Sequence, residues 1–214
     1  MSTGLWYAGG ILIGYLLGNI NTAAIIARCK GFDIRSKGSG NAGASNAFVT
    51  MGKGAAAATT LVDILKAFLP VFLLRHVIPV PEACAHLPAV TGVCVILGHM
   101  FPFWMQFRGG KGFASLLGLI FGLSWQFLLI CLGILGVILF VTRYIALASI
   151  TCAAALPVFW FITTGDVFET VLFAGIAVII ISKHIQNIKR IANGTEIPLG
   201  SKKKTAAETD DAKE

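Results

Sequence analysis

Long apolar stretches, separated by short polar and glycine-rich interruptions, dominate the chain. Most run for roughly 18 to 23 residues, and about 20 helical residues are needed to cross the roughly 30 Å of a bilayer's hydrocarbon core. This length indicates helical spans, not the short alternating strands of a membrane barrel. The pattern predicts spans near 5–27, 54–74, 88–107, 145–163 and 168–183, together with a longer apolar block over 113–142.

The block from Phe113 to Thr142 is too long for one ordinary span. As a single helix it would extend about 45 Å, well beyond the hydrocarbon core. The sequence Gly122-Leu-Ser-Trp125 in its middle is a plausible break. We therefore expect two spans here, the first of them short and near 112–123. The prediction is an all-α polytopic membrane protein with seven transmembrane helices.

The distribution of charge predicts the orientation. Seven spans place nearly all of the 17 Lys and Arg residues on one side of the membrane. On the other side lie Arg75 and a turn that carries Asp166 and Glu169. Because cytoplasmic segments are enriched in Lys and Arg, the N-terminus is expected outside and the C-terminus in the cytoplasm. We expect residues 1–200 to form one transmembrane domain, and the mixed-charge segment 201–214 to be a disordered cytoplasmic tail.

Composition excludes several classes of protein. The chain is 56% hydrophobic and 13% charged, with a mean hydropathy of +0.81, whereas soluble domains are about 25% charged. This composition disfavours a soluble enzyme. A nucleic-acid binder is also disfavoured, because the orientation of a membrane protein alone accounts for the net charge of +7. The five cysteines form no C-x-x-C pair, so the sequence predicts neither a disulfide framework nor a metal site.

The first candidate site is the glycine-rich segment Lys37–Asn46. Its glycines allow tight turns with exposed backbone amides, and Arg35 and Lys37 supply positive charge. Such a segment can surround a phosphate with N–H groups, although it lacks the spacing of a P-loop. A flexible connection between helices is the alternative. The candidate ligands are Gly38, Ser39, Gly40, Asn41, Gly43, Ser45 and Asn46.

The second candidate site begins at Gly98-His99 and continues into Arg108-Gly-Gly-Lys-Gly112. Two cations and three glycines directly precede the apolar run that starts at Phe113. Amides and positive charge at a helix N-terminus favour an anion. A positive-inside anchor is the alternative for the cations, but it would not need the glycines. His99, near the end of its span, is a candidate because ionisable groups within membranes are often functional.

The third candidate site is the segment Ser182–Glu196. On a helix, His184 and Asn187 would share one face, while Lys183 and Lys189 would point in other directions. Asn193-Gly194 would end this helix, and Glu196 follows as the only carboxylate of the segment. Elsewhere, Asp63 and Lys66 are three residues apart within a span, where mutual pairing is the expected arrangement.

Common catalytic patterns are absent from the sequence. No H-x-x-x-x-D motif, paired Asp-rich motif or G-x-S-x-G elbow occurs. Instead, the three glycine-rich segments together resemble the three signature motifs of the bacterial acyl-phosphate:glycerol-3-phosphate acyltransferase family, the membrane-integral PlsY type. The resemblance extends over about residues 5–197, with the motifs in the family's order. It is carried by Gly38–Asn46, by Gly98–Pro102 with Phe107–Gly112, and by Lys183–Arg190 with Asn193–Glu196.

The resemblance implies an enzyme of the bacterial inner membrane whose active site faces the cytoplasm. It would transfer an acyl chain from acyl phosphate to the 1-hydroxyl of glycerol 3-phosphate, giving lysophosphatidic acid. No cofactor, metal or nucleic acid is implied. Catalytic roles fall on Ser39, His99, Lys111, His184 and Asn187. Binding of substrate or phosphate falls on Gly38, Gly40, Asn41, Gly43, Ser45, Asn46, Arg108, Gly109, Gly110, Gly112, Ser149 and Glu196.

The sequence departs from the family pattern at three positions. Val49 stands where a typical member has Arg, Ala146 where a Ser is typical, and Ile185 where an Arg is common. Two alternatives therefore remain at this stage. One is a diverged relative that acylates another acceptor, and the other is a membrane protein that binds or transports a small phosphorylated molecule.

Overall fold

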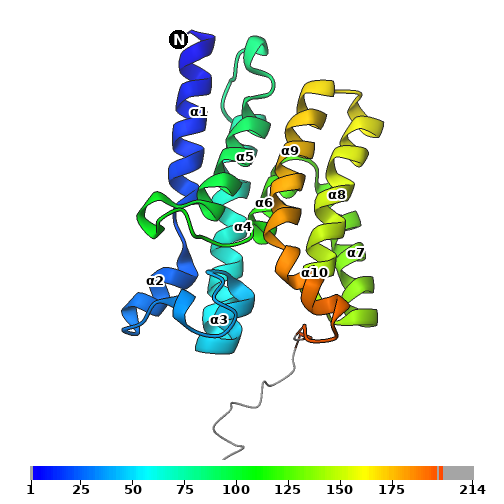
Figure 1. The fold of residues 1–214 in the computed structure, drawn as a ribbon. Coiled ribbons are helices and arrows are strands. Elements are labelled where there is room, and N and C mark those ends of the chain that lie inside the picture. Colours follow the sequence, from blue (N-terminus) through cyan, green and yellow to red (C-terminus); the bar gives the residue numbers. More distant parts are fainter. Residues whose placement is uncertain (1, 197, 200–214) are drawn as a thin grey trace, which may run out of the picture.

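The computed structural model describes residues 2–196 and 198–199, and among these residues it contains helices and no strand (Figure 1). This confirms the predicted all-α fold class. The predicted tail, 201–214, lies outside the described residues. Three single 3₁₀ turns cover Ile34–Ser36, Glu82–Cys84 and Phe103–Met105. The α-helices are α1 Thr3–Gly18, α2 Thr22–Cys29, α3 Ala44–Met51, α4 Lys53–His76, α5 Leu87–Met100, α6 Phe113–Leu123, α7 Trp125–Thr142, α8 Ile145–Thr164, α9 Val167–Lys183 and α10 Ile185–Ala192.

Five helical segments are long and apolar enough to cross a membrane: Thr3–Cys29, Lys53–His76, Glu82–Met105, Trp125–Thr142 and Ile145–Thr164. A sixth is reached if α9 and α10, which meet at a bend of 51°, are taken as one broken span. Helix α6 has only 11 residues, a length of about 16 Å, and is shorter than the hydrocarbon core. The protein is therefore a multi-pass membrane protein.

Two of the predicted spans, 5–27 and 88–107, correspond to the span-length segments Thr3–Cys29 and Glu82–Met105, but each contains a break in its helix. The first is interrupted between α1 and α2, where Asn21 caps α2 by accepting a hydrogen bond from the Ala24 N–H. The span predicted near 5–27 is present, and polar capping by Asn21 divides it into two helices. The helix predicted over 88–107 ends at Met100, since the residue before Pro102 is disfavoured in a helical conformation.

The predicted break in the long apolar block is confirmed. Helix α6 ends at Leu123, and Ser124 adopts an extended conformation with φ of −155°. The Ser124 hydroxyl then caps α7 by accepting a hydrogen bond from the Phe127 N–H. The block is therefore two helices with a polar junction.

Glycines allow the central helices to approach closely. A Cβ on Gly18 of α1 would lie 2.2 Å from the Val95 carbonyl oxygen of α5, and one on Gly118 of α6 would lie 2.2 Å from the Ile64 carbonyl oxygen of α4. Small residues at such crossings are the usual means of packing helices in membranes. Helices α1, α4, α5 and α6 therefore hold the loops at their ends in fixed relative positions.

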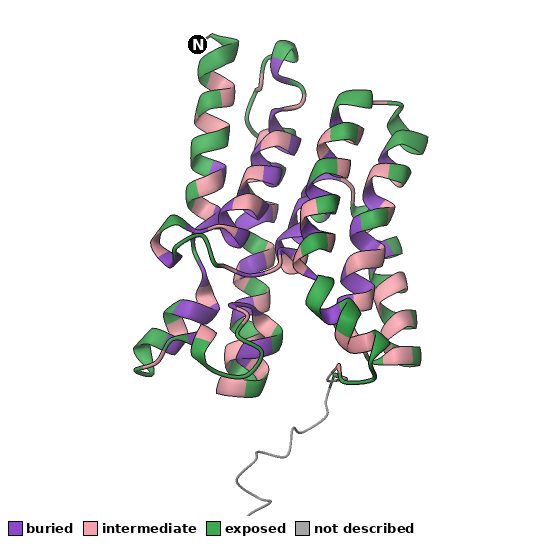
Figure 2. Cartoon of the chain, viewed as in Figure 1, coloured by how far each residue is buried: buried purple, intermediate pink, exposed green. Residues whose placement is uncertain are grey.

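The outer surface is apolar, as expected for contact with lipid. Figure 2 shows exposed residues over much of α1, and large hydrophobic side chains such as Phe140 of α7 and Ile162 of α8 are 90% and 76% exposed. Helices α2, α3 and α10 all lie at the end opposite the N-terminus, with α10 beside α8 and α9 (Figure 1). The three short helices are thus at one end of the bundle, and the segment between α5 and α6 crosses its middle (Figure 1).

Candidate active site

A cleft of about 380 Å³ brings parts of all three candidate segments together. Three basic residues line it from positions far apart in the sequence, Arg35, Arg108 and Lys183, and the Arg35 guanidinium is paired with Asp33 at 2.7 Å. Asn41 and Gln106 add amide groups, and Gly40 and Gly109 complete the lining. Guanidinium and ammonium groups around an open polar cleft are the usual elements of a phosphate-binding site.

Asn46 organises the first segment from inside. Its side chain is 1% exposed, accepts a hydrogen bond from the Ser39 N–H at 2.8 Å, and donates to the carbonyls of Ile34 and Lys37, each at 3.0 Å. Gly38 has φ of +63° and lies so close that a Cβ there would be 2.2 Å from the Asn46 Oδ1. Asn46 therefore shapes the loop, whereas Asn41 reaches the cleft.

The second segment folds back onto the C-terminal end of α5. The N–H groups of Gly109 and Gly110 donate to the carbonyls of Met100 and His99, each at 3.1 Å. A Cβ on Gly110 would lie only 2.1 Å from His99 Nε2, so the loop backbone lies directly against the imidazole ring. Gly112, with φ of +90°, then turns the chain into α6.

The other side of the His99 ring meets a buried charged network. Lys66 donates to Asp63 Oδ1 at 2.7 Å, and its Nζ lies 2.9 Å from His99 Nδ1. Lys66 also donates to the carbonyls of Gly18 and Ile20, which are left free where α1 ends. The predicted pairing of Asp63 with Lys66 is confirmed. It extends to His99, so that one network fixes both the α1–α2 break and the imidazole.

A second polar cluster joins Lys111 to the third segment. Lys111 Nζ donates to Asn187 Oδ1, and Asn187 Nδ2 donates to Glu196 Oε1 at 2.5 Å. Glu196 also pairs with Arg190, whose Nε lies 2.6 Å from Glu196 Oε2. Burial lowers the pKa of Lys111 to about 8, and the nearby Arg190 charge acts in the same direction. The ammonium is held in place by groups that leave it only weakly neutralised.

His184 lies at the junction of α9 and α10, where the chain bends. Its ring is buried, and Nδ1 lies 2.8 Å from the Ile180 carbonyl oxygen, which fixes the ring against its own helix. As predicted, Asn193-Gly194 ends the following helix, with Gly194 at φ of +67°. The charges of Lys111 and Glu196 act on this ring, so His184 lies near the Lys111 cluster.

The predicted site residues fall into distinct places. Gly40, Asn41, Arg108 and Gly109 line the cleft, and Lys111, Asn187 and Glu196 form the second cluster. The backbone of Gly38, Gly110 and Gly112 shapes the loops that carry these groups. Ser149 lies apart, buried on α8 with its hydroxyl donating to the Ile145 carbonyl, and the structure joins three further predicted residues to neither group by a side-chain contact: Ser39, Gly43 and Ser45.

Sequence reasoning missed two residues that line the cleft. Gln106 was not singled out, and Lys183 was expected to point away, yet its ammonium lies 4.3 Å from the centre of the Phe101 ring beside the cleft. The bend after Lys183 changes the helical register on which that expectation rested. Of the departures from the family pattern, Val49 is half-exposed on α3, Ala146 is buried on α8, and Ile185 is exposed on α10.

The apolar helices define an integral membrane protein, and a cleft lined by cationic side chains opens among its candidate segments. A family model described as glycerol-3-phosphate acyltransferase matches residues 8–194. The chain is 40% identical to a glycerol-3-phosphate acyltransferase of Mesorhizobium japonicum, over 90% of this chain and 95% of the relative, and 39% identical to one of Geotalea daltonii, over 87% and 94%. The chain belongs to the glycerol-3-phosphate acyltransferase family.

Two solved structures agree with this assignment. The chain is similar to the crystal structure of PlsY (YgiH), an integral membrane glycerol 3-phosphate acyltransferase, in its glycerol 3-phosphate form, with a TM-score of 0.82 and 32% identity over 91% of this chain and 96% of that one. The lysophosphatidic acid form of PlsY gives a TM-score of 0.77 and 33% identity, over 91% and 95%. The protein is thus a membrane-integral acyltransferase.

Proposed function

We propose that the protein transfers a fatty acyl chain from acyl phosphate to the 1-hydroxyl of glycerol 3-phosphate, giving lysophosphatidic acid and inorganic phosphate. The observation that carries this proposal is a pair of cationic sites built from neighbouring residues of the second and third segments. Arg35, Arg108 and Lys183 line one, and Lys111 with its Asn187 and Glu196 partners forms the other. Two phosphate-bearing substrates would occupy two such sites, and the apolar helices suit a fatty acyl chain.

The cleft is assigned to the phosphate of glycerol 3-phosphate. Guanidinium groups bind phosphate oxygens with two parallel hydrogen bonds, and ammonium groups act as point charges. Asn41 adds a neutral hydrogen-bonding group on the same wall. This binding holds the 1-hydroxyl toward the second cluster, and orientation of this kind is a large part of catalysis when the donor is already activated.

Lys111 is assigned the role of stabilising the negative charge that develops in the reaction. The hydroxyl oxygen forms a bond to the acyl carbonyl carbon, the bond from that carbon to the phosphate oxygen breaks, and phosphate leaves with the bonding electrons. A fixed ammonium stabilises the negative charge on the carbonyl oxygen and the leaving phosphate. The hydroxyl proton passes to the phosphate of glycerol 3-phosphate itself. His99, held by Lys66, positions the Gly110 backbone and through it Lys111.

We also propose seven spans, with α6 as a short fourth span surrounded by protein, the N-terminus outside and the cleft facing the cytoplasm of a bacterial inner membrane. Residues 1–200 would act as one domain, with 201–214 as a disordered tail. The positive-inside distribution of Lys and Arg supports this orientation. In a functional cysteine-free background, an impermeant thiol reagent should label intact cells at position 80 and not at position 40. The reverse pattern would overturn the orientation.

A panel of acyl donors and acceptors tests the reaction. Purified protein in detergent is incubated with labelled glycerol 3-phosphate and, separately, palmitoyl phosphate, a palmitoyl thioester of coenzyme A, or a palmitoyl carrier-protein thioester. Lysophosphatidic acid is expected with palmitoyl phosphate alone. Product from a thioester and not from the acyl phosphate would overturn the donor. Transfer from palmitoyl phosphate to another polyol phosphate in preference to glycerol 3-phosphate would overturn the acceptor.

A further inference from the structure

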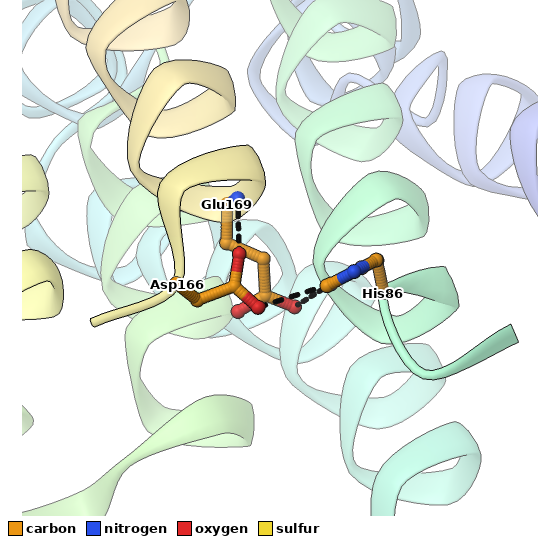
Figure 3. A group of neighbouring side chains, drawn as sticks. All are labelled: His86, Asp166 and Glu169. Atoms are coloured by element: carbon orange, nitrogen blue, oxygen red, sulfur yellow. Dashed lines mark hydrogen bonds and ion pairs between the residues drawn. The ribbon is translucent and has the colours of Figure 1, made fainter. Parts of the chain in front are cut away.

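A second cluster of ligand-type side chains lies at the end of the bundle opposite the cleft. Figure 3 shows the ring of His86, at the N-terminal end of α5, facing the carboxylates of Asp166 and Glu169 at the start of α9. One ligand atom from each residue lies within 4.8 Å of the others. The sequence did not indicate this group, because His86 is about 80 residues away from the two acids.

The His86 imidazole is within ion-pair distance of both carboxylates, but both contacts are longer than a charge-assisted hydrogen bond. His86 Nδ1 lies 3.4 Å from Asp166 Oδ2 and 3.3 Å from Glu169 Oε1. A charge-assisted hydrogen bond measures about 2.7–2.9 Å, and one N–H cannot point at two carboxylates at once. By contrast, two ligands at about 2.1 Å from a tetrahedral Zn²⁺ are separated from each other by about 3.4 Å. The two distances from the imidazole nitrogen therefore match the spacing between ligand atoms around one ion.

The surroundings hold these side chains in position. Asp166 caps α9, with Oδ1 accepting the Glu169 N–H at 2.9 Å, so that Oδ2 remains directed at His86. The His86 ring packs on the Phe168 ring at a centroid distance of 4.7 Å. Glu169 is only 5% exposed. A buried carboxylate beside a second carboxylate needs a positive charge, and one imidazole supplies at most a single one.

We propose that His86, Asp166 and Glu169 bind a divalent cation of the Zn²⁺ type, with water in the fourth position. Imidazole and carboxylate together form a ligand set that suits this metal. The ion would tie the N-terminal end of α5 to the N-terminal end of α9. The opposite ends of the same two helices carry His99 and His184, so the ion would fix the distance between two helices that carry the active site. This inference does not depend on the reaction proposed above.

Direct metal titration of the purified full-length protein tests the site. The protein is stripped with a chelator, and ZnCl₂ binding is measured by isothermal titration calorimetry, with thermal unfolding recorded in parallel. The decisive variant is Asp166→Asn, because an Asn side chain still caps α9 and removes only the carboxylate ligand. His86→Ala removes the imidazole. His76→Ala, at the end of α4 and outside the cluster, is the matched control.

One Zn²⁺ per protein is expected, with a rise of about 5 °C or more in the unfolding midpoint at zinc a hundredfold above its dissociation constant. Asp166→Asn and His86→Ala should each weaken binding at least about tenfold and abolish the rise, while His76→Ala should leave both unchanged. Absence of binding to the folded parent protein would overturn the proposal. So would binding that Asp166→Asn and His86→Ala leave unaltered.

Discussion

Replacing Gly110 with Ala tests whether the contact between the second loop and His99 sets the position of Lys111. The added Cβ would lie 2.1 Å from His99 Nε2 and 3.0 Å from the Ala42 carbonyl oxygen, whereas ordinary contacts begin near 3.4 Å. The ring cannot easily retreat, because its Nδ1 faces the Lys66–Asp63 pair. The loop must therefore move by more than 1 Å.

The size of the effect follows from this displacement. A misplacement of about 1 Å at a reacting group can cost about a hundredfold in rate, and overpacking costs about 1–3 kcal/mol of stability. We expect kcat/KM for lysophosphatidic acid formation to fall about a hundredfold. Gly133→Ala in α7 is the matched control, since nothing lies within 4 Å of its Cβ position. If Gly110→Ala retained the activity and unfolding midpoint of the parent protein, the positioning argument would be refuted.

Three further predictions concern single groups of the site. The Lys111 ammonium has a pKa of about 8 and is charged below it, so kcat/KM should fall as the pH rises through about 8. In a pH profile, Lys111→Arg should move this fall to higher pH, because the guanidinium stays charged. An unchanged fall in Lys111→Arg would contradict this prediction. Asn46→Asp keeps the acceptor for the Ser39 N–H but loses the two hydrogen bonds that the Asn46 amide donates. The free energy of unfolding, measured by thermal or denaturant unfolding, should therefore drop by about 2–4 kcal/mol. Asn193→Asp, at an exposed position, is the control. Val49→Arg adds a cation one helical turn after Asn46, and the KM for glycerol 3-phosphate should fall about tenfold or more; an unchanged KM in an active variant would mean that position 49 does not face the acceptor.

The all-helical fold and most helix positions follow from the sequence, because membrane thickness fixes the length of an apolar run that can span it. The Ser124 junction was predictable from Gly122 and Ser124 within an overlong block. The break at Asn19–Asn21 was not predicted, although two Asn residues within an apolar run signal it. Its stability depends on Lys66, which donates to the freed carbonyls from another helix, and such tertiary contacts cannot be read from local sequence.

The three candidate segments were recognisable from glycine and cation spacing, but the roles within them were not. Asn46 is of a residue type that often binds ligands, but its side chain is used to hold the backbone of its own loop. Lys183 lines the cleft because the chain bends after it, and periodicity on a straight helix gives the wrong direction. Asp63 and Lys66 were expected to pair with each other, and their contact with His99 depends on the packing of α4 against α5.

The most direct test of the account is the KM for glycerol 3-phosphate in two cleft variants, Arg108→Gln and Lys183→Gln, with Lys189→Gln as the control on an exposed position of α10. One charge-assisted contact contributes about 1.5–3 kcal/mol, which corresponds to about a tenfold to hundredfold change in affinity. The account predicts that KM for glycerol 3-phosphate rises by at least about tenfold in each cleft variant and stays at the parent value in Lys189→Gln. Parent values of KM and kcat in both folded cleft variants would contradict it.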